Sequence, residues 1–536
     1  MRWWGWGEDG HDVNLPEDAT FLLETQLGIS RGERRSPVAL EEVRLPEPRL
    51  PAPLRERLSA LLGAEHVRDD RAARVEHALG RSYPDLIRLR SGDGSSAPDV
   101  VVHPGSAEEV AAVLAACAEA RAAVVPFGGG TSVVGGVEPL ADGYAGAVSL
   151  DLRRLDAVAG IDRTSLTARL GAGMLGPEIE RRLGEEGLTL GHFPQSFEYS
   201  TLGGWVATRS AGQASTGYGR IENLVEGLRF VAPAGEIDVR ERPASAAGPE
   251  LGELLVGSEG ALGVVCEATV RVRPAPQLHR FEGWSFRSFG EGCEALRVLA
   301  QEGAAPDVAR LSDEAETGLG FALAATGGTA ERVVKRYLRM ARHERPCVAI
   351  IGFEGSEEDV ERRRLRAAAL LRGGGGLSLG RRPGDAWLRT RYAGPYLRDE
   401  LLGRGALVDT LETATSWSNL GPLYETVGGA LRRTLGPMSL VMCHVSHLYR
   451  SGASLYFTFF ARQDEDALAQ WRIVKAAASQ AIVDGGGTIT HHHGVGRDHL
   501  PWMRAEVGEL GLDLLRAAKE RLDPAGVMNP GKLLPG

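Results

Sequence analysis

The feature that most constrains this fold is a glycine-rich loop at residues 124–136, which read VVPFGGGTSVVGG. The two β-branched residues and the proline are typical of a short strand that ends in a loop. The three consecutive glycines remove every Cβ there, so backbone N–H groups can approach an anionic ligand closely. The alternative is a tight turn whose glycines only supply positive φ. Further segments of the same kind decide between the two interpretations.

This loop matches neither common nucleotide-binding motif. No Gly-Lys-Ser/Thr follows the glycines, as a P-loop requires. The Rossmann fingerprint opens a helix and has an acidic residue about 20 positions later, whereas this chain runs on into a strand-like stretch at 147–152. A diphosphate held by a loop between strands remains, which points to a flavin dinucleotide on another fold.

Composition and charge limit the function classes. With 536 residues, the chain is too long for a single core, and we expect several structural units. The net charge of −10 argues against a nucleic-acid partner. The five cysteines are scattered without a C-x-x-C pair, which gives no case for a zinc site or a disulfide framework.

Neither end of the chain carries a recognisable targeting signal. It begins MRWWGWG, unlike a signal peptide, and no apolar run reaches about 18 residues. We therefore expect a cytoplasmic protein, with peripheral membrane contact left open. The cluster of Trp3, Trp4 and Trp6 is either an amphipathic segment that contacts a membrane or, as we favour, a packed terminus. The ending Leu534-Pro535-Gly536 is no peroxisomal signal, which favours a bacterial source.

Local patterns predict a helical N-terminal region followed by alternating strands and helices. Helices are expected at 14–29 and 51–64. Ser106 is the expected N-cap of a helix that ends near Ala120, because Glu109 stands three positions after it. Strands are expected at 99–104, 122–126, 147–152, 157–162, 165–169, 269–272, 347–353 and 454–460.

Two further segments have the character of the glycine loop. Residues 191–213 read GHFPQSFEYSTLGGWVATRSAGQ, and residues 257–265 read GSEGALGVV. Small, hydroxylic and glycine residues recur there at a density that core packing does not explain.

Taken together, these segments resemble the FAD-binding domain of the vanillyl-alcohol oxidase superfamily, the PCMH type, over residues 98–274. The resemblance implies an α+β domain around a largely buried FAD. The first loop would hold the diphosphate, and the other two segments would line the ribose, adenine and isoalloxazine. Some relatives tether FAD through a histidine near the first loop, but 128–132 contain none, so noncovalent FAD is expected. The implied cofactor-binding residues are Pro126, Gly128, Gly129, Gly130, Thr131, Ser132, Pro194, Ser196, Ser200, Thr201, Gly203, Gly204, Thr208, Arg209, Ser210, Ala211, Glu259, Gly260, Gly263, Val264 and Val265.

The second half of the chain is expected to be an α/β substrate (cap) domain. The predicted organisation is a helical N-terminal region at 1–94, the FAD-binding domain at 95–275 and the cap domain at 276–475. A C-terminal segment at 476–536 would complete the active site and pack on the FAD domain.

Three features of the second half could carry chemistry. Residues 490–496 read THHHGVG after a predicted strand, Tyr456 is a single tyrosine hydroxyl among apolar residues of a strand, and Arg398 lies in a YLRD segment. Each has a structural alternative: a hydrogen-bonded core histidine, a core tyrosine and a surface ion pair. Side chains of neighbouring residues on an extended segment point to opposite faces, so we expect no metal bound by all three histidines.

These features resemble the alkylglycerone-phosphate synthase (alkyl-dihydroxyacetone-phosphate synthase) family. The resemblance also covers the opening RWWGWG and residues 191–209. It implies exchange of the acyl group of acyl-dihydroxyacetone phosphate for a fatty alcohol, as in ether-lipid synthesis, without net redox change. The flavin would carry the dihydroxyacetone-phosphate carbon between the two halves of the exchange. A homodimer is expected. The implied catalytic residues are Tyr456, His492, His493, Arg398 and Arg310.

An FAD-dependent oxidase or dehydrogenase of a D-2-hydroxy acid or alcohol is the alternative function. Residues 522–533, LDPAGVMNPGKL, are similar to the ending of bacterial D-2-hydroxyacid dehydrogenases. His444 and His447 lie where those enzymes place metal-binding histidines, but the fuller His-x-Gly-Asp-Gly-Asn pattern is missing. A fold shared by many chemistries does not choose between the two functions.

Overall fold

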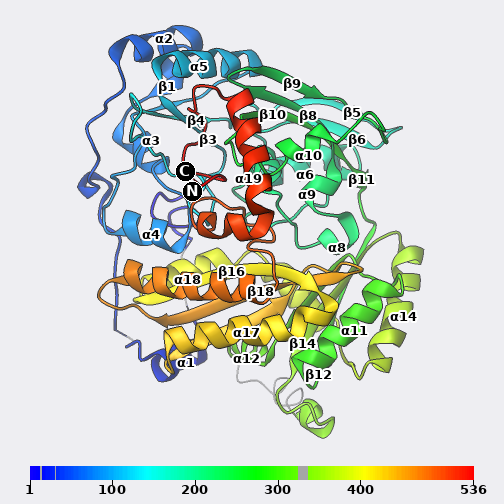
Figure 1. Ribbon diagram of the computed structural model, residues 1–536. Helices are drawn as coiled ribbons and strands as arrows, with labels where there is room; N and C mark the ends of the chain where they lie inside the picture. Colours follow the sequence, from blue (N-terminus) through cyan, green and yellow to red (C-terminus); the bar gives the residue numbers. More distant parts are fainter. Residues whose placement is uncertain (12–14, 31, 324–335, 536) are drawn as a thin grey trace.

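The computed structural model describes residues 1–11, 15–30, 32–323 and 336–535. Figure 1 shows the FAD-binding half of the chain above a large sheet that belongs to the second half. Within the described ranges, no helix is long and apolar enough to cross a membrane.

Two main sheets form the first half, beside the two-stranded pair of β7 (Leu188–Thr189) and β11 (Arg273–Pro274). One has the order β1 (Val67–Arg68), β2 (Val100–Val102), β4 (Ala147–Asp151) and β3 (Ala123–Phe127). In it, β2, β4 and β3 run parallel, because α5 (Ala107–Ala120) carries the chain across between β2 and β3. Ser106 caps α5 by accepting a hydrogen bond from the Glu109 N–H at 3.2 Å, as predicted. The glycine loop therefore leaves the end of a buried edge strand.

The second sheet is antiparallel and lies beside the first. Its order is β5 (Val158–Asp162), β6 (Thr167–Gly171), β10 (Val264–Arg271), β8 (Val225–Ala232) and β9 (Gly235–Val239). The predicted strand at 269–272 is only the end of β10, which begins at Val264. Val264 and Val265 are strand residues, 1% and 5% exposed.

The second half of the chain, the predicted cap domain, is built on a seven-stranded antiparallel sheet. Its order is β15 (Leu377–Gly380), β12 (Leu278–Phe286), β14 (Cys347–Gly355), β13 (Val308–Ser312), β17 (Ser439–Val445), β18 (Gly452–Arg462) and β16 (Ala406–Ser416). The helices α11 (Phe289–Gln301), α14 (Glu357–Gly373) and α17 (Trp417–Leu435) pack on it through a shared apolar core.

Side-chain alternation along β18 determines which residues face the FAD domain. Leu455, Phe457 and Phe459 are fully buried in the core with α17. Side chains alternate along a strand, so Tyr456 emerges on the opposite face of the sheet. That face looks toward the FAD domain in Figure 1.

Both ends of the chain pack onto these two halves. Trp6 is 2% exposed, and its N–H donates to the carboxylate of Asp399, so the predicted packed terminus is confirmed. At the other end, α19 (Met503–Leu522) lies against the FAD-binding half, coloured red in Figure 1. Beyond it, the Val124 N–H donates to the carbonyl of Val527 and the Asn529 N–H donates to that of Val124, both at 2.8 Å.

The helices predicted at 14–29 and 51–64 are present as α1 (Glu17–Leu27) and α2 (Ala52–Leu62). Residue 14 lies outside the described residues. The strand predicted directly before the three histidines is wrong. Instead, α18 (Ala467–Asp484) is followed by a loop that continues to residue 499.

Candidate active site

A cross-strand row of polar side chains forms the floor of the site. Tyr456 on β18 pairs with Glu412 on β16 and with His444 on β17. Paired residues on neighbouring strands project from the same face, so all three side chains stand on the face that looks toward the FAD domain. The register of three strands, and not proximity in sequence, brings these groups together.

The three-histidine segment, residues 491–493, closes over Tyr456. The Tyr456 ring stacks on His444 with centroids 4.8 Å apart. It lies 6.0 Å from the His492 ring and 5.7 Å from the His493 ring. The structure therefore brings three of the predicted catalytic residues, Tyr456, His492 and His493, into one cluster.

Glu412 holds the three-histidine segment in place. Its side chain is fully buried. One carboxylate oxygen accepts the backbone N–H of His493 at 2.9 Å and the hydroxyl of Thr490 at 2.8 Å, and the other accepts the N–H of His491. A longer bond comes from the His492 N–H at 3.3 Å. These donors explain how a buried carboxylate is tolerated so far from solvent.

The electrostatics of the cluster follow from burial and from this one carboxylate. Burial raises the pKa of Glu412, but His492, His493 and the backbone donors lower it more, to about 2. Burial lowers the pKa of His493 to about 3 although Glu412 opposes the shift. Burial also raises the pKa of Tyr456 to about 12. At neutral pH the site therefore contains a glutamate anion, neutral imidazoles and a protonated phenol.

Arg310 reaches the same cluster from β13. Its guanidinium donates to Glu316 at 2.8 Å and lies 3.0 Å from Nδ1 of His444. That nitrogen is also 3.0 Å from the Glu316 carboxylate. Burial raises the pKa of Glu316, but His444 and Arg310 outweigh burial and leave the pKa well below its usual value. Arg310 thus contacts Tyr456 only through the intervening His444.

Arg398 stands apart from the histidines, on α16 (Gly394–Leu402). It donates one hydrogen bond, to the carbonyl of Arg81 at 2.7 Å. Its Nε and Nη2 atoms are buried and have no hydrogen-bond partner among the described residues. A planar guanidinium with buried free donors suits a phosphate or carboxylate ligand.

The glycine loop fits an anionic cofactor. In the described part of the chain, none of the five backbone N–H groups from Gly128 to Ser132 donates a hydrogen bond. A Cβ on Gly129 would lie 1.6 Å from the carbonyl oxygen of Tyr199, and one on Gly128 would lie 2.3 Å from Oγ1 of Thr201. Only glycine allows this approach, and backbone N–H groups without partners are what a diphosphate requires.

The three predicted flavin segments meet in the structure. Gly129 lies against Tyr199 of the second segment, and Gly260 of the third lies against Pro126 of the first. The Glu259 N–H donates to the carbonyl of Ala207 at 2.9 Å, which joins the third segment to the second. Gly203, Gly204 and Thr208 belong to α7 (Leu202–Thr208), which follows the loop that contains Pro194 and Ser196.

Several of the predicted flavin ligands make protein contacts of their own. Thr201 caps α7 through the Gly204 N–H at 3.3 Å. Ser196 donates to Ser200, which also accepts from the Trp205 indole at 2.6 Å. The Arg209 guanidinium pairs with Glu253 at 2.7 Å.

The remaining members of the set lie in or next to the core. Ser210 Oγ is 3.2 Å from His192, and Ala211 is 4% exposed. Gly263 packs against Phe230, next to the buried Val264 and Val265. Their roles toward FAD stay predictions.

Glu259 has a second contact that its predicted role did not include. It adopts φ = 50°, and its carboxylate accepts the N–H groups of Val495 at 2.6 Å and Gly496 at 2.7 Å. Burial raises its pKa to about 7 although these donors lower it. The end of the histidine loop is therefore fastened to the FAD domain.

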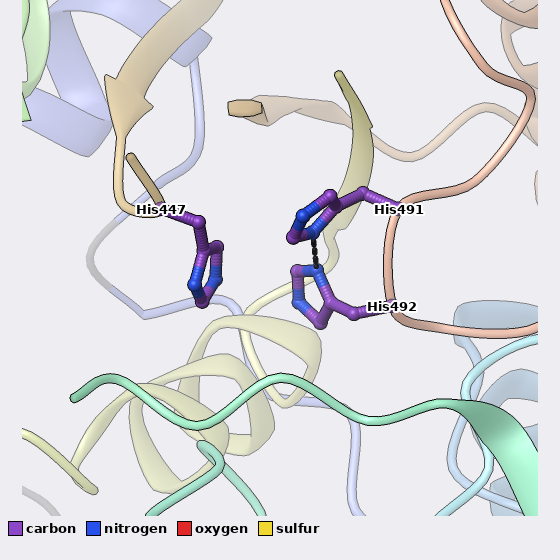
Figure 2. A group of neighbouring side chains, drawn as sticks. All are labelled: His447, His491 and His492. Atoms are coloured by element: carbon purple, nitrogen blue, oxygen red, sulfur yellow. Dashed lines mark hydrogen bonds between the residues drawn. The ribbon is translucent and has the colours of Figure 1, made fainter. Parts of the chain in front are cut away.

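His447 joins His491 and His492 in a compact group (Figure 2). The Nδ1 atoms of His491 and His492 are 2.9 Å apart, so the expectation that neighbouring histidines point to opposite faces is wrong for this pair. The segment is bent, because successive backbone N–H groups turn toward Glu412. One ring nitrogen from each histidine lies within 4.8 Å of the others, a spacing that a transition-metal ion could bridge. The absence of a metal stays a prediction.

Sequence reasoning missed Glu412, Glu316 and His192, and it considered His444 only as a metal ligand. Glu412 lies between Leu411 and Thr413 in a stretch that also contains Asp409 and several threonines, so the sequence offered no signal that this glutamate is buried.

Most of the chain matches two known families. Residues 98–239 match the family described as FAD binding domain, and residues 275–533 match FAD linked oxidases, C-terminal domain. The alkyldihydroxyacetonephosphate synthase of Dictyostelium discoideum is 34% identical over 100% of this chain and 93% of its own length. The enzyme of Trypanosoma brucei brucei is 34% identical over 100% of this chain and 92% of its own.

Solved structures agree with these relatives. An alkyldihydroxyacetonephosphate synthase structure superposes with a TM-score of 0.86 at 31% identity, covering 99% of both chains. p-Cresol methylhydroxylase gives a TM-score of 0.65 at 15% identity over 90% of this chain and 96% of its own, which shows the shared fold alone. The expected α+β fold of PCMH type is confirmed. The expected bacterial source is not supported, since both synthase relatives above are eukaryotic.

Proposed function

This chain belongs to the alkyldihydroxyacetonephosphate synthase family, and from that premise we propose that it exchanges the acyl group of acyl-dihydroxyacetone phosphate for a fatty alcohol. The enzyme is FAD-dependent. Held by the glycine loop at 128–132, FAD would supply the carrier for the dihydroxyacetone-phosphate carbon between departure of the acyl group and arrival of the alcohol. We propose that it is held noncovalently, since residues 128–132 include no histidine.

The observation that carries this proposal is the enclosure of Tyr456 by His492 and His493 on the face that looks toward the FAD domain. A phenol and neutral imidazoles in contact can move a proton at the carbon or oxygen of a bound substrate. Glu412 orients the imidazoles through their backbone, and Arg310 fixes His444 against the Tyr456 ring.

Arg398 is proposed to bind the charged end of the substrate. Its two free donors can form a bidentate pair with phosphate or with the departing carboxylate. Fixing the substrate at one end aligns its reacting carbon, and such alignment supplies a large part of an enzyme's rate enhancement.

Incubation of the FAD-loaded protein with palmitoyl-dihydroxyacetone phosphate and hexadecanol tests the function. Mass spectrometry should detect free palmitate and the alkyl product. Tyr456→Phe removes one oxygen atom, should retain FAD, and should lower product formation at least about 100-fold. If wild type makes no product and a 2-hydroxy acid bleaches its flavin without air, the chain is an FAD-linked oxidoreductase and this proposal is wrong.

Homodimer formation and peripheral membrane contact are part of the same proposal. Lipid-like substrates of the family and the exposed apolar side chains of Val507, Leu510 and Leu514 on α19 support an apolar contact surface. Light scattering of the purified protein tests the dimer, and sedimentation with phospholipid vesicles tests the membrane contact.

A further inference from the structure

A chain of hydrogen bonds leads outward from the histidine beside Tyr456. The His492 ring lies 6.0 Å from the Tyr456 ring, and its Nδ1 is 2.9 Å from Nδ1 of His491, the dashed line in Figure 2. The other ring nitrogen of His491, Nε2, is 2.6 Å from the hydroxyl of Tyr449. Both nitrogens of His491 are therefore engaged, each with a group that can exchange a proton.

The middle member of this chain is the most buried. His491 is 6% exposed, whereas His492, with 14% of its side chain exposed, and Tyr449 are only partly buried. The exposed Arg450 follows Tyr449, so a buried imidazole joins the site beside Tyr456 to a second, partly exposed position. An imidazole bonded at both nitrogens can accept a proton at one and release another at the other, because the two sites share one ring.

The proposed reaction requires such a path. Exchange of an ester's acyl group for an alcohol breaks the carbon–oxygen bond to the acyl group and forms one to the alcohol. It consumes neutral ester and neutral alcohol, and at neutral pH it yields a carboxylate. The hydroxyl proton of the alcohol must therefore leave the protein once per turnover, and no electrons are gained or lost.

We propose that His491 and Tyr449 form a proton relay that carries this proton from His492 to solvent, an inference that rests on the proposed function. His492 takes the proton on its free nitrogen and passes its Nδ1 proton to His491. His491 passes its Nε2 proton to the hydroxyl of Tyr449, which releases its own to water. His491 is a relay residue that acts through His492 and does not touch the substrate.

The groups around the relay disfavour a proton that stays on His491 or His492, so the proton is passed on. Arg220 donates to the carbonyl of His491 at 2.8 Å, and burial together with its positive charge lowers the pKa of His491 and His492. His447 packs 4.8 Å from the His491 ring, with its own Nδ1 bonded to Ser215 at 2.6 Å. Among the described residues, Glu412 is the carboxylate bonded to the three-histidine segment, mainly through its backbone N–H groups. Glu222 pairs with Arg220 at 3.0 Å.

The relay is tested in the FAD-loaded full-length enzyme with two variants and one control. His491→Gln interrupts the relay at its middle, and Tyr449→Phe removes a single hydroxyl at its outer end. His343→Gln is the matched control, because His343 is 3% exposed and bonded to a serine hydroxyl but lies in the cap domain outside the cluster. Substrates are palmitoyl-dihydroxyacetone phosphate and hexadecanol.

We expect kcat to fall about tenfold or more in His491→Gln and in Tyr449→Phe, with KM and FAD content as in wild type. Added imidazole should restore part of the rate in His491→Gln, which a purely structural defect would not allow. The solvent deuterium isotope effect should rise in both variants.

Wild-type rates in the two variants, or reduced rates that neither imidazole nor deuterium changes, would overturn the relay alone. If His491→Gln does not fold, Tyr449→Phe decides by its rate and isotope effect. Absence of alkyl product from wild type itself would overturn the proposed function, and the relay with it.

Discussion

Glu412→Gln retains the shape of the side chain that holds the three-histidine segment and removes its charge. The pKa of Glu412 lies at about 2, against 4.5 for the same group free in water. That difference corresponds to about 3 kcal/mol of stability at neutral pH. Because the pKa is lower in the folded protein than in the unfolded chain, this stability is present above pH 4.5 and is lost as the pH falls toward 2.

The expected result at pH 7 is a loss of about 3 kcal/mol in the free energy of unfolding, measured by urea denaturation of the FAD-loaded protein. A segment displaced by even 1 Å can lower a rate about 100-fold, so kcat should fall by that order with FAD still bound. Glu282→Gln is the matched control, since Glu282 is 6% exposed on the same sheet but β14, β13, β17 and β18 separate its strand from β16.

Two outcomes would refute this reasoning. One is a Glu412→Gln enzyme with the stability and rate of Glu282→Gln. The other is a difference between Glu412→Gln and wild type that does not shrink as the pH is lowered from 4.5, because the argument assigns that difference to the ionised carboxylate.

Three further predictions concern the rest of the site. Arg398→Lys keeps the charge but loses the planar fork, so the KM for acyl-dihydroxyacetone phosphate should rise about tenfold or more in steady-state kinetics; an unchanged KM would exclude Arg398 as the anion ligand. Gly129→Ala should purify without FAD, judged by its absorbance spectrum, because the new Cβ would meet the Tyr199 carbonyl at 1.6 Å; the control Gly160→Ala, with no atom within 4 Å of its Cβ, should keep its flavin. Relative to wild type, Glu259→Gln should gain stability as the pH rises from 4.5 to about 7. The reason is that the Glu259 pKa is raised to about 7, so wild type loses the stability contributed by the protonated carboxyl over that range. The free energies of unfolding are compared by urea denaturation across pH, and a constant difference between the two proteins would contradict this prediction.

Local patterns in the sequence predict much of this fold, because each depends on residues near one another. The N-cap at Ser106, predicted from a glutamate three positions later, is present. The predicted strand at 454–460 exists as β18, and its alternation places Tyr456 opposite the apolar core. The glycine loop could be assigned to an anionic ligand because three consecutive glycines carry no Cβ, which allows close approach to the backbone there.

The partners of Tyr456 could not be predicted in this way. Glu412 and His444 reach it only through the register of β16, β17 and β18, and a shift of one residue would turn either side chain to the other face. Glu316 enters through its bonds to Arg310 and His444, from the helix that follows β13. The distances in sequence between these residues follow no helix or strand period, so a sequence pattern could not reveal the contacts.

The geometry of the three-histidine segment follows from one further physical fact. In an extended strand, successive N–H groups point to opposite sides, so three in a row cannot reach one carboxylate. Here the N–H groups of residues 491–493 all reach Glu412, which forces the backbone to curve and brings His491 and His492 together. The carboxylate that the sequence did not reveal is therefore the reason that the predicted extended segment is wrong.

The same loop is held at its other end by a carboxylate from the opposite half of the molecule. Glu412 comes from the cap sheet, whereas Glu259 comes from the FAD-binding half and takes the N–H groups of Val495 and Gly496. Between them, Gly494 adopts φ = 87°, a conformation that suits glycine. The loop that carries the histidines is therefore attached to both halves. Because the flavin-binding loop and the tyrosine belong to different halves, this double attachment couples the position of the proton-transfer groups to the alignment of one half with the other.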